Sequence, residues 1–158
     1  MQPPSPIRAT DTEARSIAHT LLVQAKSCAL GVIDPQTGAP MVTRIALGLG
    51  DDGAILTLIS GLAAHTNALR ENPNVGLLIG DPGDKGDPLT HPRLSISARA
   101  EMPAQTQSLR DHWLKTHPKS KLYIDLPDFR FIRFIPIKAS LNAGFGRAFH
   151  LTPDDLRA

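Results

Sequence analysis

Short β-type segments follow one another early in the chain with no helix between them. Gly, Pro and Asp separate these segments: residues 34–38 read Asp-Pro-Gln-Thr-Gly, and residues 48–53 hold a second group of Gly and Asp. Such residues favour chain reversal. The pattern therefore predicts an antiparallel meander of strands over 28–34, 40–47 and 54–60. It disfavours a doubly wound parallel sheet, which needs a helix after each strand.

The rest of the chain predicts three helices and further strands. Apolar residues recur at helical spacing up to about Lys26, and Thr10 with Glu13 has the form of a capping box, so a first helix is expected there. Pro103 stands where a later helix would begin, a position that tolerates proline. The other expected elements are helices over 63–71 and 103–116 and strands over 75–80, 93–102 and 129–142, after which residues 145–151 close the chain. The predicted fold is mainly β, a closed antiparallel β-barrel with flanking helices.

Length and composition are those of one folded domain. The 158 residues are 41% apolar and 20% charged, which is typical of a globular chain with its own core. Residues 1–9 are rich in proline and are expected to form a disordered lead-in, with a single domain over 10–158. Residues 81–92 are the one long segment rich in Gly, Pro and Asp inside this domain, and loops of that length are often functional.

Charge and hydropathy exclude several partners. A net charge of +2 without a stripe of Lys and Arg disfavours nucleic acid. No apolar stretch approaches the roughly 18 residues of a membrane helix, and the N-terminus lacks the form of a secretory signal. We therefore expect a cytoplasmic protein without membrane contact. Cys28 is the single cysteine, which excludes an intrachain disulfide, and no His, Cys and carboxylate spacing predicts a metal site.

Arg44 is the first residue that can carry chemistry. It stands in an otherwise largely apolar predicted strand. A guanidinium in such surroundings must be paired or solvated. One interpretation is a rim arginine in water or in a salt bridge. The other is phosphate recognition, to which the rigid two-pronged donor is suited.

The segment 58–67 runs from a strand through a small-residue turn into the start of a helix. Free backbone N–H groups and the positive end of the helix dipole gather at such a start and favour an anion. Ser60, Thr66 and Asn67 add neutral donors, and His65 can add a proton. Alternatively, these side chains only cap the helix. No known catalytic motif occurs elsewhere, so no catalytic residue is predicted.

The sequence resembles a known family. Residues 60–69, Ser-Gly-Leu-Ala-Ala-His-Thr-Asn-Ala-Leu, and 72–79, Asn-Pro-Asn-Val-Gly-Leu-Leu-Ile, resemble the pyridoxamine 5′-phosphate oxidase-related FMN-binding split barrels. Residues 128–134, Asp-Phe-Arg-Phe-Ile-Arg-Phe, and 142–148, Asn-Ala-Gly-Phe-Gly-Arg-Ala, resemble its haem-utilisation (HugZ-like) branch. The similarity covers residues 10–151.

The resemblance implies that FMN lies in a groove between the two subunits of a homodimer. His65 stands where members that oxidise the vitamin carry lysine, and Arg93 would reach the cofactor from the partner chain or cover its ring. The acidic tail 151–158 replaces the basic motif that grips the vitamin's phosphate, which argues against that substrate. The cofactor-binding residues that the resemblance implies are Thr43, Arg44, Leu58, Ile59, Ser60, His65, Thr66, Asn67 and Arg93.

Three functions stay open from the sequence. The first is a flavin-dependent oxidoreductase acting on an unidentified small molecule, with haem or another conjugated ring as one class. The second is a module that binds or stores FMN, F420 or haem without turnover, and the third is an interaction protein without a cofactor. His150 is either an axial haem ligand or a surface histidine. Arg147 either meets a haem propionate or pairs with a carboxylate.

Overall fold

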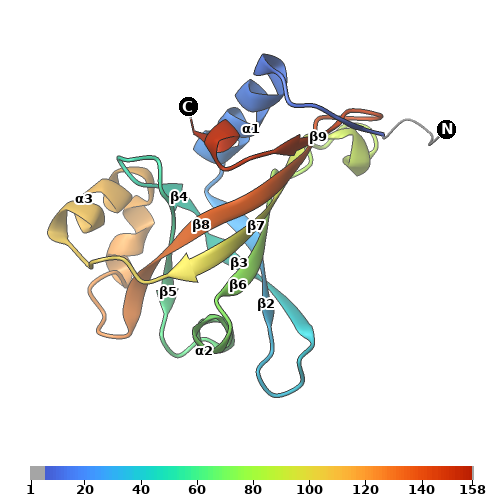
Figure 1. Cartoon of the computed structure of the whole chain (residues 1–158). Coiled ribbons are helices and arrows are strands. Elements are labelled where there is room, and N and C mark those ends of the chain that lie inside the picture. Colours follow the sequence, from blue (N-terminus) through green and yellow to red (C-terminus); the bar gives the residue numbers. More distant parts are fainter. Residues whose placement is uncertain (1–5, 158) are drawn as a thin grey trace.

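The computed structural model describes residues 6–157, which form one nine-stranded sheet with three α-helices (Figure 1). The hydrogen-bonded order is β1-β9-β8-β7-β6-β2-β3, while β5 pairs with both β4 and β8. All pairs are antiparallel except β1 with β9. The strands are β1 Ile7–Arg8, β2 Ser27–Ile33, β3 Pro40–Ala46, β4 Gly48–Leu49, β5 Ile55–Ser60, β6 Asn74–Ile79, β7 Arg93–Glu101, β8 Phe129–Asn142 and β9 Ala148–Leu151.

The long strand β8 pairs with three other strands. One edge of β8 pairs with β7, and its other edge pairs first with β5 and then with β9. The strands β2, β3, β5, β6, β7 and β8 curl into a barrel, in which β3 lies near β5 without pairing to it. The prediction of a mainly β, antiparallel split barrel is confirmed. The closed barrel and the three-strand meander were wrong, because the β4–β5 hairpin carries β5 onto β8 instead of onto β3.

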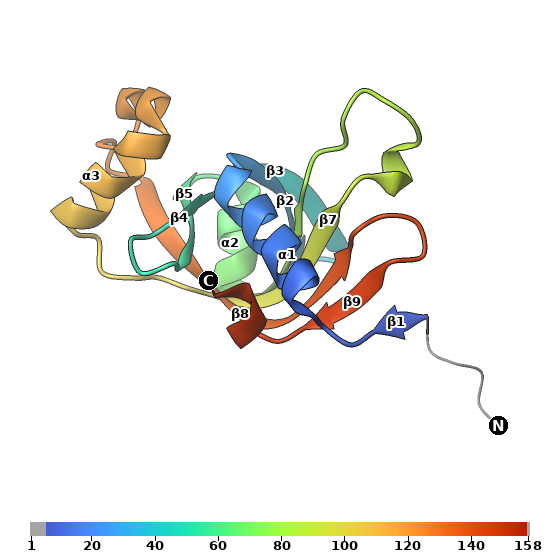
Figure 2. The same cartoon turned by 90° about the horizontal axis from the view of Figure 1, so that it is seen from above.

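The helices occupy three separate places. Helix α1, Thr12–Gln24, crosses one opening of the barrel, and α2, Ala64–Glu71, lies at the opposite end (Figures 1 and 2). Helix α3, Gln107–Thr116, packs outside the barrel. The short 3₁₀ helices are η1 Pro88–Thr90, η2 Pro118–Leu122 and η3 Asp154–Leu156.

Helices α1 and α3 each begin later in the chain than the sequence predicts, because a later side chain caps the first turn. Asp11 caps α1, because its Oδ1 accepts the N–H of Ala14 at 2.7 Å, whereas Thr10 donates to the carbonyl of His150 at 2.8 Å. Thr106 caps α3 by accepting the N–H of Leu109 at 3.1 Å. The residues from Pro103 to the cap are therefore outside the helix.

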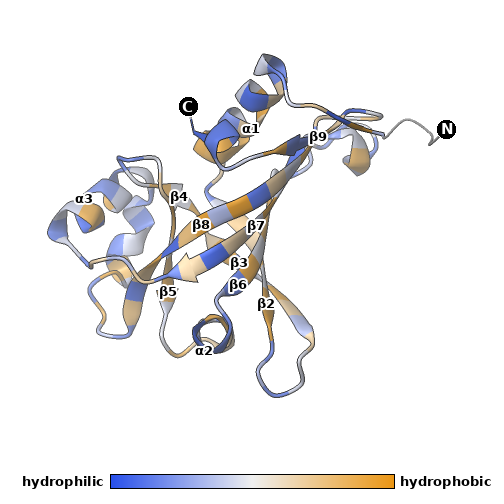
Figure 3. Cartoon of the chain, in the orientation of Figure 1, coloured by the Kyte–Doolittle hydropathy of each residue, from blue (hydrophilic) through white to orange (hydrophobic). Residues whose placement is uncertain are grey.

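Two apolar clusters hold the fold together. The larger fills the barrel and includes the inward residues of the strands and one face of α1. The smaller one joins the outer face of the barrel to α3 and η2 and consists of Leu56, Leu58, Trp113, Ile124 and Phe131. Figure 3 shows hydrophobic and hydrophilic residues interleaved along β7 and β8, as expected for strands with one buried face.

The structure describes only part of the segment that was expected to form a disordered lead-in. Of the lead-in predicted over 1–9, residues 1–5 lie outside the described residues, and Ile7–Arg8 pair with β9 as β1. Cys28 is buried, and desolvation raises the pKa of its thiol to about 12. Within residues 6–157, no helix is long and apolar enough to cross a membrane.

Gly48 leaves the space in which the smaller cluster packs. A Cβ at this position would lie 2.8 Å from Cζ3 of Trp113 and 3.0 Å from Cε1 of His117. We expect Gly48→Ala to lower the free energy of unfolding by about 1–3 kcal/mol, because the ring must move. The control is Gly76→Ala, since a Cβ there meets nothing within 4 Å. Urea denaturation of both variants tests this, and equal stabilities would contradict it.

Candidate functional site

The opening turn of α2 presents unused backbone donors. Its N-cap residue, Ala63, makes no side-chain hydrogen bond to the helix. The N–H groups of Thr66 and Asn67 bond to the carbonyl of Ala63, at 3.1 and 3.4 Å. The N–H groups of Ala64 and His65 precede these bonds and have no intrahelical acceptor. An anion at this end would also meet the positive end of the helix dipole.

His65 adds a buried nitrogen to this turn. Its Nε2 is inaccessible to solvent and has no hydrogen-bond partner among residues 6–157. Desolvation by burial lowers the pKa of His65 below the ordinary histidine value. A buried polar atom without a partner is unfavourable in the folded protein. If the ring turned to expose Nε2 to an anion at this turn, the bond would remove that cost and would favour the imidazolium form.

Ser60 is held by Asp128 rather than free. Its hydroxyl donates to Asp128 Oδ2 at 2.6 Å, and its oxygen accepts the N–H of Leu62 at 3.1 Å. The N–H of Gly61 donates to the Asp128 carbonyl at 2.6 Å. Asp128 therefore fixes the turn between β5 and α2 and places a carboxylate beside it. Sequence reasoning missed this contact, because the two residues are 68 positions apart and no local pattern joins them.

The other two residues predicted on α2 differ in their surroundings. Thr66 is buried, and its hydroxyl donates to the carbonyl of Ser60 at 2.5 Å, so it closes the turn. Asn67 is exposed on the helix surface. Thr66 therefore has a structural bond, whereas the Asn67 amide is accessible to a ligand.

Arg44 lies on the outer face of the barrel. It pairs in register with Ala29, whereas its neighbour Thr43 pairs with Leu30, whose side chain belongs to the barrel core. Adjacent strand residues face opposite ways, so Thr43 faces inward and Arg44 outward. Arg44 is exposed, and no ion pair or hydrogen bond joins its guanidinium to another described residue. Arg44 thus lies within the β2–β3 ladder rather than at a rim of the barrel, and its guanidinium is available to a ligand.

The strand residues before Ser60 alternate in the same way. Ile59 belongs to the barrel core, while Leu58 belongs to the outer cluster under α3. Ser60 follows on the outer face, and β3 lies near β5. Arg44, Leu58 and Ser60 therefore share the outer face of the barrel, and Thr43 and Ile59 face the opposite way.

Arg93 lies at the opposite end of the sheet from α2. It begins β7, whereas α2 leads into β6 beside the end of β7, where Asn74 pairs with Arg99. The guanidinium of Arg93 donates to the carbonyl of Leu89 at 3.0 Å. Within one chain, Arg93 does not join the α2 turn, so a shared site would require a second chain.

Arg93 instead lines a hollow of about 220 Å³ on the outer face of β7, β8 and β9. The polar residues of its wall are Arg93, Ser95, Ser140, Asn142 and His150, and none of the lining residues is acidic. His150 is exposed. Arg147 pairs with Glu13 at 2.9 Å, in agreement with the carboxylate alternative. Within residues 6–157, no three His, Cys, Asp or Glu residues are grouped to hold a metal ion.

Comparison with known proteins identifies the family. Residues 17–142 match the family model of pyridoxamine 5′-phosphate oxidase. The non-canonical heme oxygenase HOZ of Arabidopsis thaliana chloroplasts is 30% identical over 115 residues, which are 71% of this chain and 34% of that protein. The chain thus spans about a third of the length of this curated relative.

Solved structures share the fold. One solved chain is 51% identical, with a TM-score of 0.89 over 94% of this chain and 98% of its own. The heme binding protein from Mycobacterium smegmatis is 24% identical, with a TM-score of 0.81 over 99% of this chain and 61% of its own. The chain therefore belongs to the pyridoxamine 5′-phosphate oxidase-related split-barrel family.

Proposed function

We propose that this chain binds FMN and works as a flavin-dependent oxidoreductase on a small conjugated substrate. Flavin binding is a property of the pyridoxamine 5′-phosphate oxidase family. The observation that carries the proposal is the start of α2, where a helix without a side-chain cap stands beside the buried, unpartnered Nε2 of His65. Both features favour an anionic acceptor such as the FMN phosphate.

The residues present fit the phosphate with two exceptions, of which one is the Asp128 carboxylate beside the turn, since it would repel an anion. The N–H groups of Ala64 and His65, the His65 ring and the Asn67 amide would donate to it, and Arg44 would supply a full positive charge. Ser60 would not donate, since its proton is already given to Asp128. The remaining donors are sufficient, because charge-assisted bonds to phosphate are roughly twice as strong as neutral ones.

The chain's own residues would bind and orient, while the flavin ring would supply the electron transfer. Arg44 would neutralise the phosphate on the outer face of the barrel. Leu58 would act only by shaping that face, because its side chain is packed in the smaller apolar cluster. Thr43 and Ile59 would contribute only through the backbone, because their side chains face inward. We further propose a homodimer in which Arg93 of one chain reaches the cofactor held by the other.

A haem-binding function is the second candidate. The hollow that contains Arg93 and His150 has no acidic lining residue, so it would accept the carboxylates of a haem. His150 would then be the candidate axial ligand. The names of the chloroplast and mycobacterial relatives point the same way. This candidate is compatible with haem as the substrate of a flavin-dependent reaction or as stored cargo.

The direct test is to identify what the purified protein carries. We expect flavin absorbance and release of FMN on denaturation, measured by mass spectrometry. Bleaching by NAD(P)H followed by loss of an added haem's Soret band would support the oxidoreductase function. Haem retention without turnover would favour the storage alternative. A colourless protein that takes up neither FMN nor haem would overturn the proposal.

FMN affinity should depend on pH through His65. Burial lowers the pKa of His65 in the free protein, whereas a bound phosphate would raise it again. Protons are then taken up on binding, so affinity should rise as pH falls between these two pKa values. The control is His65→Gln, which lacks the imidazole. FMN itself titrates in the same way with either protein, so its contribution cancels in a comparison of the two. The ratio of wild-type to variant affinity, measured by fluorescence quenching from pH 8 to 6, should rise on acidification. A constant ratio would contradict the role of His65.

A further inference from the structure

We propose that a second site, next to Arg133 on the outer face of the barrel, binds a small molecule with a carboxylate at one end and an ammonium at the other. This site is separate from the α2 turn. It lies at the beginning of β5, while α2 follows the end of that strand. The inference does not rest on FMN binding.

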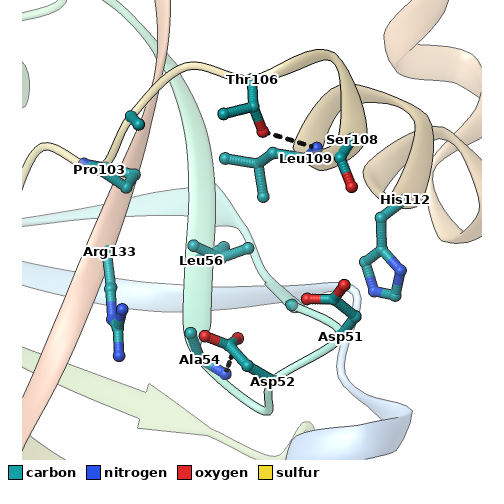
Figure 4. Close-up of a pocket in the computed structure, with 12 residues that line it drawn as sticks. Asp51, Asp52, Ala54, Leu56, Pro103, Thr106, Ser108, Leu109, His112 and Arg133 are labelled. Carbon is teal, nitrogen blue, oxygen red and sulfur yellow. Dashed lines mark hydrogen bonds between the residues drawn. The ribbon is translucent and has the colours of Figure 1, made fainter.

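Two adjoining hollows define the site. One, of about 250 Å³, lies between the turn before β5 and the segment that leads into α3 (Figure 4). The other, of about 560 Å³, reaches towards α1 and η3. Asp51, Asp52, Ala54 and Arg133 line both. Arg133 therefore stands at the junction of the two hollows.

Arg133 has hydrogen-bonding capacity that the protein does not use. Its Nε is buried and has no hydrogen-bond partner in the described part of the chain. Its nearest carboxylate among residues 6–157 is Glu101, whose Oε1 is 3.9 Å from Nε, which is too long for a hydrogen bond. Glu101 lines neither hollow. The Arg133 side chain as a whole is 40% exposed, so a ligand carboxylate can reach the outer nitrogens of the guanidinium fork and supply acceptors to them.

The opposite side of the smaller hollow is acidic. Figure 4 shows Arg133 on one side of Leu56, and Asp51 with His112 on the other. Asp51 has no ion-pair partner within residues 6–157. His112 Nε2 donates to the carbonyl of Leu49 at 2.9 Å, so in the neutral ring Nδ1 is an acceptor. These groups attract a cation and repel an anion.

The middle of the site is apolar. Leu56 and Leu109 line the smaller hollow between the charged ends. A purely anionic ligand would face the two aspartates, and a purely cationic ligand would face Arg133. A molecule with both charges on a short aliphatic body satisfies both ends and covers the apolar floor. This complementarity is what specifies the ligand class.

Three probes that share a six-carbon chain test the proposal: 6-aminohexanoate, hexanoate and hexylamine. Amide signals of residues 50–54 and 133 should shift saturably with 6-aminohexanoate in ¹H–¹⁵N NMR titrations of the full chain. Hexanoate and hexylamine should bind at least about tenfold more weakly, since each lacks one charge-assisted contact. Equal binding of hexanoate or hexylamine, or no saturable shift with any probe, would overturn the proposal.

Variants separate the site from general charge effects. Arg133→Gln should reduce 6-aminohexanoate binding to the level of hexylamine, and Asp51→Asn to the level of hexanoate. Arg133→Lys keeps the charge but loses the fork, so it should bind with intermediate affinity. The matched control is Arg99→Gln, an exposed arginine on β7 that lines neither hollow. FMN affinity should be unchanged in Arg133→Gln, so failure here is distinguishable from failure of the FMN proposal. Unchanged probe binding in a folded Arg133→Gln protein would contradict the inference.

Discussion

Replacing Trp113 with alanine should lower the free energy of unfolding by about 3–5 kcal/mol, the range for truncating a large buried aromatic residue. Trp113 is 1% exposed and lies at the centre of the smaller cluster. Its ring stacks on His117 with centroids 4.0 Å apart and meets Phe131 edge-on at 5.6 Å. Because this cluster joins α3 to the barrel, its loss should also loosen α3 and η2.

Trp113→Phe is the matched control for this substitution. It keeps most of the apolar volume but removes the indole N–H that donates to Ser120 Oγ at 3.0 Å. Ser120 is buried and keeps a contact with the Tyr123 hydroxyl at 3.2 Å. The loss should therefore be about 1–3 kcal/mol, typical of an incompletely satisfied buried group. Urea denaturation measures both variants, and a loss below about 1 kcal/mol for Trp113→Ala would contradict the packing described.

Replacing Arg44 with alanine should weaken FMN binding about 10- to 100-fold, the loss of one or two charge-assisted hydrogen bonds. The fold should be unaffected, because Arg44 is exposed and has no partner in the described part of the chain. Its substitution should change the free energy of unfolding by less than about 0.5 kcal/mol. Fluorescence titration with FMN measures the affinity.

The control for Arg44 is Arg8→Ala. Arg8 is an exposed arginine on β1, which pairs with β9, so it removes the same charge from another region of the molecule. Arg44→Lys should fall between wild type and alanine, since lysine keeps the charge without the two-pronged donor. Equal weakening by Arg8→Ala would mean that overall charge, rather than a local contact, governs FMN affinity.

Much of the fold was predictable from local patterns. The strand expected over 129–142 has those bounds in the structure, because its β-type composition and flanking breakers are unambiguous. The pairing of β5 with β8 instead of β3 was not predictable, because β8 comes much later in the chain. The caps at Asp11 and Thr106 compete with adjacent capping residues, and sequence alone does not rank them.

The sequence predicted which segments form the candidate site, but not how their side chains are arranged. The backbone donors at the start of α2 follow from the turn and helix pattern. Alternation along a strand places Thr43 and Ile59 on the inner face, although the family resemblance names them beside Arg44. The Asp128 contact with Ser60 and the hollow beside Arg133 both depend on residues brought together only by the folded sheet.

The central claim is that the phosphate of a flavin is bound between Arg44 and the opening turn of α2. Comparing the affinities of FMN and riboflavin tests it, because the two ligands differ only in the phosphate. Wild-type protein should bind FMN at least about 100-fold more tightly than riboflavin, and Arg44→Ala should reduce that ratio about tenfold or more. Equal affinities of the wild-type protein for the two ligands would contradict the claim.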